Sequence, residues 1–150
     1  MITRKFNKVL KILSEKLNRI DYVIVGSTNL ALQGVNVKPK DVDILTDKKG
    51  AYSINERLKE YETLNVEWRK SKRFNSYFGK FNINGVEVEV MGELHNNIPP
   101  VEVWKDFDKN KVKIKINNSF IYGISLEKEL HAYTVMKKKK LKQLKEFLKI

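Results

Sequence analysis

The sequence predicts a single domain over residues 1–150 of the α/β (α+β) class, with a mixed β-sheet and flanking helices, packed mainly on one face. Two observations carry this prediction. Several short stretches alternate apolar and polar residues, which is the period of a strand with one buried face. Both ends of the chain repeat an apolar residue every three or four positions, which is the period of an amphipathic helix. A chain of 150 residues is also a common size for one domain.

The first part of the chain predicts helices and strands in alternation. An apolar stripe predicts the N-terminal helix, and its members are Phe6, Val9, Leu10, Leu13, Leu17 and Ile20. Residues 22–25 are typical of a short buried strand, residues 28–33 can start a helix, and residues 41–45 predict a second strand. A further helix is expected over residues 51–61, where Ser53 to Glu56 matches a capping box.

The second part of the chain predicts mainly strands. These cover residues 65–69, 74–83, 86–91, 111–116 and 120–122. The pair Asn84–Gly85 favours a tight hairpin turn between two of them, because both residues tolerate positive φ. A last apolar stripe predicts a C-terminal helix with Ser125 as its N-cap, and its members are Leu126, Leu130, Tyr133, Leu141, Leu144 and Leu148.

A glycine and a serine stand where the first predicted strand passes into a helix. Gly26 lets the backbone approach a ligand closely because it has no side chain. Ser27 adds a hydroxyl group at the start of the helix, where backbone N–H groups and the helix dipole favour an anion. Gly26 and Ser27 are therefore candidate phosphate-binding residues.

Two aspartates then stand on alternate positions of the second predicted strand. Asp41 and Asp43 flank Val42, so both carboxylates project to one side while Val42 and Ile44 face the other. Two carboxylates on one face repel each other unless a cation neutralises them. Mg²⁺ is commonly held by one or two carboxylates together with phosphate oxygens and water, so this pair predicts a magnesium site.

Together these motifs resemble the signature of the DNA polymerase beta-like nucleotidyltransferase superfamily, and the chain is similar to its small, minimal members. The resemblance rests on Val25-Gly26-Ser27 followed by Asp41-Val42-Asp43-Ile44. It implies a third carboxylate on a later strand. Glu87 and Glu89 both suit that place, on one face of the strand over 86–91. Glu89 is preferred as the last acid before the turn at Gly92, and Glu87 is the second choice.

The resemblance implies a transferase that moves a nucleoside monophosphate from a nucleoside triphosphate, such as ATP, to a hydroxyl acceptor. Asp41, Asp43 and Glu89 would be the catalytic, metal-binding residues for two Mg²⁺ ions. Gly26, Ser27 and Lys137 would bind the nucleotide, since related proteins often place a basic residue of the C-terminal helix near the triphosphate. The acceptor stays open: small members of the superfamily modify antibiotics, proteins, RNA ends or partner toxins, and a homodimer or partner protein could complete the acceptor site.

Each motif also has an ordinary structural reading when it stands alone. Gly-Ser turns are common, and acidic residues on alternate positions often form the solvated face of a strand. A second hypothesis is therefore a non-catalytic RNA- or protein-binding module that retains the nucleotidyltransferase fold. The presence of all three acidic positions, in the right order, favours the enzyme.

Charge is unevenly distributed along the chain. The net charge is +12, and residues 1–20 and 125–150 each contribute +5. Such a balance favours polyanionic partners such as RNA or nucleotide phosphates. A generally lysine-rich composition, which keeps a surface hydrated, would produce the same balance.

Composition excludes several classes of site and location. The chain has no cysteine and two histidines, so disulfides, thiolate metal sites and a histidine-based zinc site are not expected. The N-terminus has no apolar segment of the kind found in signal peptides, and no apolar stretch approaches the length that spans a membrane. We therefore expect a soluble, cytoplasmic protein without a membrane partner.

Overall fold

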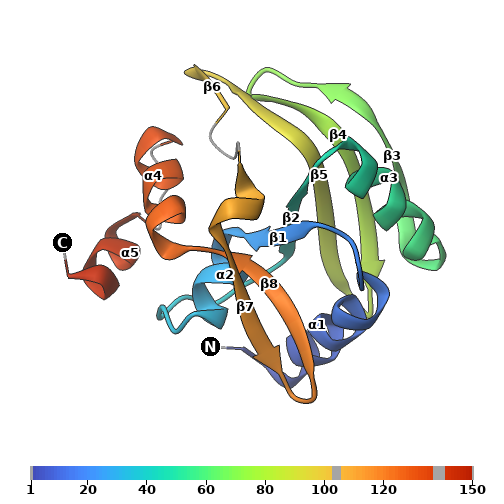
Figure 1. Cartoon of the computed structure of the whole chain (residues 1–150), viewed down its shortest axis with the longest axis horizontal. Coiled ribbons are helices and arrows are strands. Elements are labelled where there is room, and N and C mark those ends of the chain that lie inside the picture. Colours follow the sequence, from blue (N-terminus) through green and yellow to red (C-terminus); the bar gives the residue numbers. More distant parts are fainter. Residues whose placement is uncertain (1, 103–105, 137–140, 150) are drawn as a thin grey trace.

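A computed structural model describes residues 2–102, 106–136 and 141–149 (Figure 1). Within these residues the helices are α1 (Arg4–Lys16), α2 (Gly26–Leu32), α3 (Lys48–Arg57), α4 (Leu126–Met136) and α5 (Leu141–Leu148). The strands are β1 (Tyr22–Val25), β2 (Val42–Thr46), β3 (Glu62–Lys70), β4 (Phe74–Ile83), β5 (Val86–Asn97), β6 (Pro100–Val101), β7 (Lys111–Ile116) and β8 (Ser119–Ile124). Two short 3₁₀ helices, η1 (Lys59–Tyr61) and η2 (Phe107–Asn110), complete the elements. None of the helices in these ranges has the length and apolar character needed to cross a bilayer.

The strands form one mixed sheet in the order β3-β4-β5-β2-β1-β8-β7, with β6 paired to β5. Strand β2 is antiparallel to β1 and parallel to β5, while β1 is parallel to β8. The predicted α/β class with a mixed sheet is therefore confirmed. The predicted hairpin is confirmed too, since Asn84 and Gly85 both have positive φ, 51° and 86°, as a tight β4–β5 turn requires.

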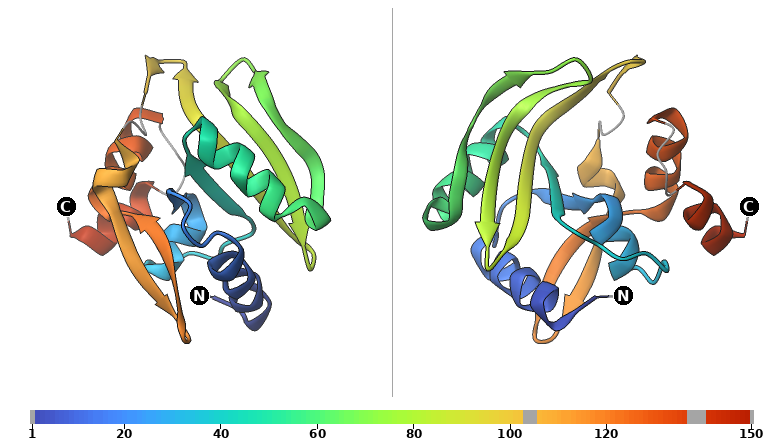
Figure 2. Two further views of the ribbon diagram at one scale, coloured as in Figure 1. Left: turned by 45° about the vertical axis from the view of Figure 1, so that its right-hand side comes forward. Right: turned by 180° about the vertical axis from the view of Figure 1, so that it is seen from behind.

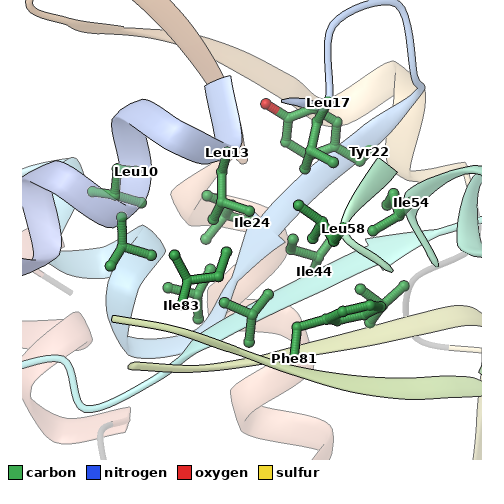
Figure 3. Packing of buried hydrophobic residues seen from close by; sticks show 14 of the residues in the cluster. Leu10, Leu13, Leu17, Tyr22, Ile24, Ile44, Ile54, Leu58, Phe81 and Ile83 are labelled. Carbon is green, nitrogen blue, oxygen red and sulfur yellow. The ribbon is translucent and has the colours of Figure 1, made fainter. Parts of the chain in front are cut away.

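The main core lies between the sheet and the pair of helices α1 and α3 (Figure 3). The apolar stripe predicted for the N-terminal helix faces the sheet, since Leu10, Leu13 and Leu17 are at most 1% exposed. Ile24 of β1 and Phe81 of β4 are fully buried against it. Every second residue of the strands points to this side, and the others point to the opposite face.

The opposite face of the sheet carries a second core, and it is packed against α4. Its buried members are Val23, Val25, Leu45, Leu94, Ile124 and Ala132. The expectation that helices pack mainly on one face is therefore wrong. The apolar stripe predicted for the C-terminal helix covers this second side. Residues of α4 and α5 pack there against Leu30, Val35 and Val37.

Helix α3 begins and ends earlier than the capping-box pattern predicts. The observed N-cap is Asp47, whose side chain accepts a hydrogen bond of 2.7 Å from the Gly50 N–H. A carboxylate at this position caps a helix as well as a serine does, and Asp47 directly follows the end of β2 at Thr46. The predicted cap at Ser53 consequently lies inside the helix.

Candidate functional site

Asp43 and Glu89 lie opposite each other on two neighbouring strands. They are register partners in the parallel pairing of β2 with β5, so their side chains project from the same face of the sheet. Both are partly buried, and a hydrogen bond joins the two carboxyl groups. Val42, Ile44, Val88 and Val90, their strand neighbours, are fully buried on the other face. The alternation along each strand therefore holds both acids on the face that carries α4.

The pKa of Glu89 is raised above its ordinary value. Burial is the largest cause, because it disfavours the charged form. The neighbouring carboxylates of Glu87 and Asp41 raise it further, while Lys80 and the hydrogen bond with Asp43 act in the opposite direction. The ammonium group of Lys80 lies 3.8 Å from the Glu89 carboxylate and 3.5 Å from that of Glu87. Excess negative charge is thus concentrated at this point of the sheet.

The structure distinguishes the two candidates for the third carboxylate by their position. Glu87 is exposed, and its register partner on β4 is Asn82. Glu89 is the one that stands opposite Asp43. Asp41 is half-buried in the connection just before β2, close enough for its charge to raise the pKa of Glu89. Its carbonyl oxygen accepts a 2.5 Å hydrogen bond from the buried Thr28 hydroxyl, which ties this connection to α2.

The glycine turn lies directly beside the acidic pair. Helix α2 begins at Gly26, whose φ is +76°. A Cβ atom at this position would lie 3.1 Å from Asp43 Oδ2, so the glycine is needed both for its backbone conformation and for space. Ser27 is partly exposed. The Gly26 N–H donates to the carboxylate of Glu129 over 2.6 Å, so this N–H already has an acceptor. Gly26 would instead assist phosphate binding because the absence of a side chain leaves space for the phosphate group.

Glu129 is a residue of this site that the sequence did not single out. It lies on α4 and is fully buried. Besides Gly26, the amide of Asn29 donates to its Oε1 over 2.9 Å, so one carboxylate fastens α4 to the start and the middle of α2. Glu129 stands four residues before Tyr133, a member of the predicted apolar stripe, and so lies on the same side of the helix. This position was the signal in the sequence that Glu129 is buried. The pKa of Tyr133 is raised by burial first and then by the charges of Glu129 and Asp43.

A cavity of about 490 Å³ opens next to Asp43 and Glu89. It is lined by Val25, Asp43, Arg69, Lys70, Ser71, Phe74, Ser76, Phe78, Glu89, Met91 and Leu94. Most of these residues come from β3, β4 and β5, the neighbouring green to yellow strands that curve together in Figure 2. The acidic pair therefore stands at one end of a space large enough for a small molecule.

The donor set suits a magnesium ion that arrives with its own phosphate ligands. In the ranges that the structure describes, no three carboxylate or histidine side chains already form a metal-holding group. Asp43 and Glu89 alone supply two neighbouring carboxylates, and Mg²⁺ typically takes one or two of these plus phosphate oxygens. Lys137, the predicted basic partner of the triphosphate, lies outside the described residues.

Replacing Gly26 by alanine tests how tightly this turn is built. The positive φ alone is expected to make the change unfavourable by about 1–2 kcal/mol, and crowding against Asp43 adds to that. Gly34→Ala is the matched control, because Gly34 also has a positive φ of +95° but a Cβ there would meet only the Phe147 ring at 3.5 Å. Urea unfolding should show the larger loss for Gly26→Ala. Equal losses would mean that the contact with Asp43 is relaxed easily.

The fold and the acidic pair beside a glycine turn define a protein of the nucleotidyltransferase-like superfamily. The chain belongs to the aminoglycoside-2''-adenylyltransferase family, whose pattern it matches over residues 6–146. It superposes with a TM-score of 0.81 on a candidate nucleotidyltransferase from Thermotoga maritima, at 31% identity over 99% of this chain and 96% of the other.

A second solved structure extends the similarity in fold. It is an antigenic nucleotidyltransferase-like protein from Paracoccidioides brasiliensis, with a TM-score of 0.57 and 20% identity over 96% of this chain and 73% of that one. No curated protein matches the chain at a comparable level. The family match over residues 6–146 and the similarity to the Thermotoga maritima structure confirm the superfamily expected from Gly26, Ser27, Asp41 and Asp43.

Proposed function

We propose that this chain transfers a nucleoside monophosphate, in the first instance AMP from ATP, to a hydroxyl group of an acceptor. One observation carries the proposal: Asp43 and Glu89 stand side by side on paired strands, between a glycine turn and a cavity. Membership of a family that is named for adenylyl transfer supports AMP as the transferred group. The name of that family mentions an aminoglycoside acceptor, which does not by itself settle the acceptor here.

The residues divide into a donor side and an acceptor side. On the donor side, Gly26 leaves space for a phosphate group next to Asp43 and Ser27 offers a hydroxyl for hydrogen bonding. Asp41, Asp43 and Glu89 are proposed to hold Mg²⁺, as two ions. When bound, these ions would stabilise the charge that develops on the attacking and leaving oxygens. On the acceptor side, the cavity walls orient the hydroxyl-bearing molecule and keep water from the reacting atoms.

The bond changes follow from this division. The acceptor oxygen forms a bond to the α-phosphorus of the triphosphate as the bond from that phosphorus to the pyrophosphate oxygen breaks. The hydroxyl proton is lost, and pyrophosphate leaves with the negative charge. No side chain needs to form a covalent intermediate, so the chain contributes by positioning and electrostatics.

Calorimetry of Mg–ATP binding tests the donor side. The wild type is expected to bind ATP only with Mg²⁺, and the Asp41→Asn/Asp43→Asn variant is expected to lose this binding. The matched control is Asp106→Asn/Asp108→Asn, which removes two exposed acidic charges that do not line the cavity. Both variants should keep their melting temperature within a few degrees. Unchanged binding by the Asp41/Asp43 variant would contradict the proposal.

The same samples separate the enzyme from the binding module considered as its alternative. A module that uses its basic surface should bind RNA without Mg²⁺ and should lose affinity steeply as salt rises. That behaviour, combined with no Mg–ATP binding by the wild type, would favour the module. Metal-dependent ATP binding followed by release of pyrophosphate in the presence of an acceptor would favour the transferase.

A further inference from the structure

The cavity reaches from Val25 and the acidic pair, beside the glycine turn, to β3 at the edge of the sheet. In the strand order β3-β4-β5-β2-β1, Gly26 follows β1, and Asp43 and Glu89 occupy β2 and β5. The remaining walls come mostly from β3, β4 and the connection between them, together with Val25 of β1 and Met91 and Leu94 of β5. If the triphosphate lies against the glycine turn, as proposed above, the part of the cavity formed by β3 and β4 is left for the acceptor.

Its walls are apolar and aromatic, and beyond the acidic pair their charges are positive. Phe74, Phe78, Met91 and Leu94 supply the apolar surface. The two other charged lining residues are Arg69 and Lys70. Arg69 is held in place, because its guanidinium donates to the carbonyl oxygens of Phe78 over 3.3 Å and Asn65 over 2.9 Å. It also forms an ion pair of 3.5 Å with Glu67, so Lys70 is the main cation offered by the lining.

The basic turn, Arg69–Arg73, comprises the last two residues of β3 and the connection to β4, and Arg69, Lys70 and Ser71 of this segment line the cavity. The β3–β4 turn, Arg69-Lys70-Ser71-Lys72-Arg73, carries four cations in five residues. The turn is fixed by hydrogen bonds: the Phe74 N–H donates to the Ser71 hydroxyl over 2.9 Å, and the Asn97 N–H donates to the Arg73 carbonyl over 2.7 Å. Positive charge is thus presented at a defined place beside two phenylalanine rings.

We infer that the acceptor is a nucleotide unit with a free hydroxyl group, not a polycationic aminoglycoside. The inference rests on the proposed function and names the substrate class for its acceptor side. A base can pack on Phe74 or Phe78, and its phosphate can pair with the basic turn. An amine-rich sugar would instead meet the like charge of Lys70 in the lining and those of Lys72 and Arg73, which are exposed next to it in the chain. Among the described residues that line the cavity, the acids are the pair assigned to the metal ions.

A free nucleotide and the 3′ end of an RNA share this chemistry. In both, a ribose oxygen forms a bond to the α-phosphorus of ATP, the bond to pyrophosphate breaks, and the hydroxyl proton is released. The product is a phosphodiester in either case. The two sources differ in how many phosphates reach the basic turn, since an RNA continues beyond the terminal unit.

Transfer from α-labelled ATP with Mg²⁺ tests the inference. The acceptors are AMP, a six-nucleotide oligoadenylate with a free 3′-hydroxyl, the same oligonucleotide with a 3′-phosphate, and kanamycin. Label is expected on AMP or on the free-ended oligonucleotide, but on neither the blocked one nor kanamycin. Label on AMP identifies the free nucleotide as the source, and label only on the oligonucleotide identifies an RNA end.

A charge variant ties the result to the basic turn. Lys70→Gln/Lys72→Gln/Arg73→Gln should raise the KM for the nucleotide acceptor by about tenfold or more and leave calorimetric Mg–ATP binding unchanged. The control Lys5→Gln/Lys8→Gln/Lys11→Gln removes three charges from α1, on the other face of the sheet, and should leave both unchanged. An unaltered KM in the turn variant would overturn the inference.

The remaining outcomes distinguish the two proposals. Better transfer to kanamycin than to either nucleotide acceptor overturns the inference and leaves the proposed function intact. Mg–ATP binding without transfer to any nucleotide acceptor also overturns it. Failure of the wild type to bind Mg–ATP at all would remove the proposed function, and the inference with it.

Discussion

Replacing Glu89 by glutamine is expected to abolish transfer while making the protein more stable at neutral pH. On the proposed mechanism the carboxylate holds Mg²⁺ in the transition state, where such charge stabilisation is worth several kcal/mol. Its loss should lower kcat/KM by about 100-fold or more. The melting temperature should instead rise, because burial of the charged Glu89 carboxylate opposes folding and glutamine carries no charge.

The gain in stability follows from the raised pKa of Glu89. Because the folded state binds the carboxyl proton of Glu89 more tightly than the unfolded state does, the protonated Glu89 stabilises the fold. This stabilisation is fully present at pH values below the ordinary glutamate pKa. It is lost as the pH rises through the raised pKa, and the ionised carboxylate then opposes folding. Glutamine has no charge at any pH, so the advantage of Glu89→Gln should disappear below about pH 4.

Melting curves in EDTA at pH 4 and pH 7 measure this difference, and transfer assays measure the loss of activity. Glu87→Gln is the matched control, because Glu87 stands on the same face of β5 but is exposed. It should change both the melting temperature and the activity much less. A lower melting temperature for Glu89→Gln at pH 7 would show that Glu89 stabilises the fold instead of straining it.

Replacing Glu129 by alanine is expected to lower the free energy of unfolding by about 3 kcal/mol. The fully buried carboxylate accepts from the Gly26 N–H and from the Asn29 amide. Without it, a buried backbone donor loses its acceptor and a space opens between α4 and α2. Glu129→Gln keeps an acceptor oxygen in the same place, so this variant should lose less free energy of unfolding than Glu129→Ala.

Urea unfolding measures these changes, with Glu127→Ala as the control. Glu127 lies on the same helix and is exposed, so its replacement should alter stability by no more than about 0.5 kcal/mol. Since Gly26 borders Asp43, we also expect weaker Mg–ATP binding in Glu129→Ala. Equal stability of the two alanine variants would mean that Glu129 does not fasten the turn.

Local patterns predicted most of the elements that build the site. Apolar and acidic residues alternate strictly around Val42 and Val88, which predicts that Asp43 and Glu89 point away from the main core. The structure shows this arrangement on both strands. The Asn84–Gly85 turn was equally predictable, because few residue pairs accept positive φ twice. The start of α3 was not, since Asp47 and Ser53 are both suitable caps, and the structure shows that Asp47 is the one used.

The sequence by itself determined the class of fold, the superfamily and the candidate acids, because periodicity, turn residues and the spacing of Gly26, Asp41 and Asp43 are local properties. Only the tertiary structure decided which acid faces Asp43, since register depends on how β2 and β5 pair. It also brought Glu129 to Gly26, across 103 positions of the chain, and placed the basic turn at Arg69–Arg73 beside the cavity. Such neighbours are set by packing between distant segments, and no short stretch of sequence encodes them.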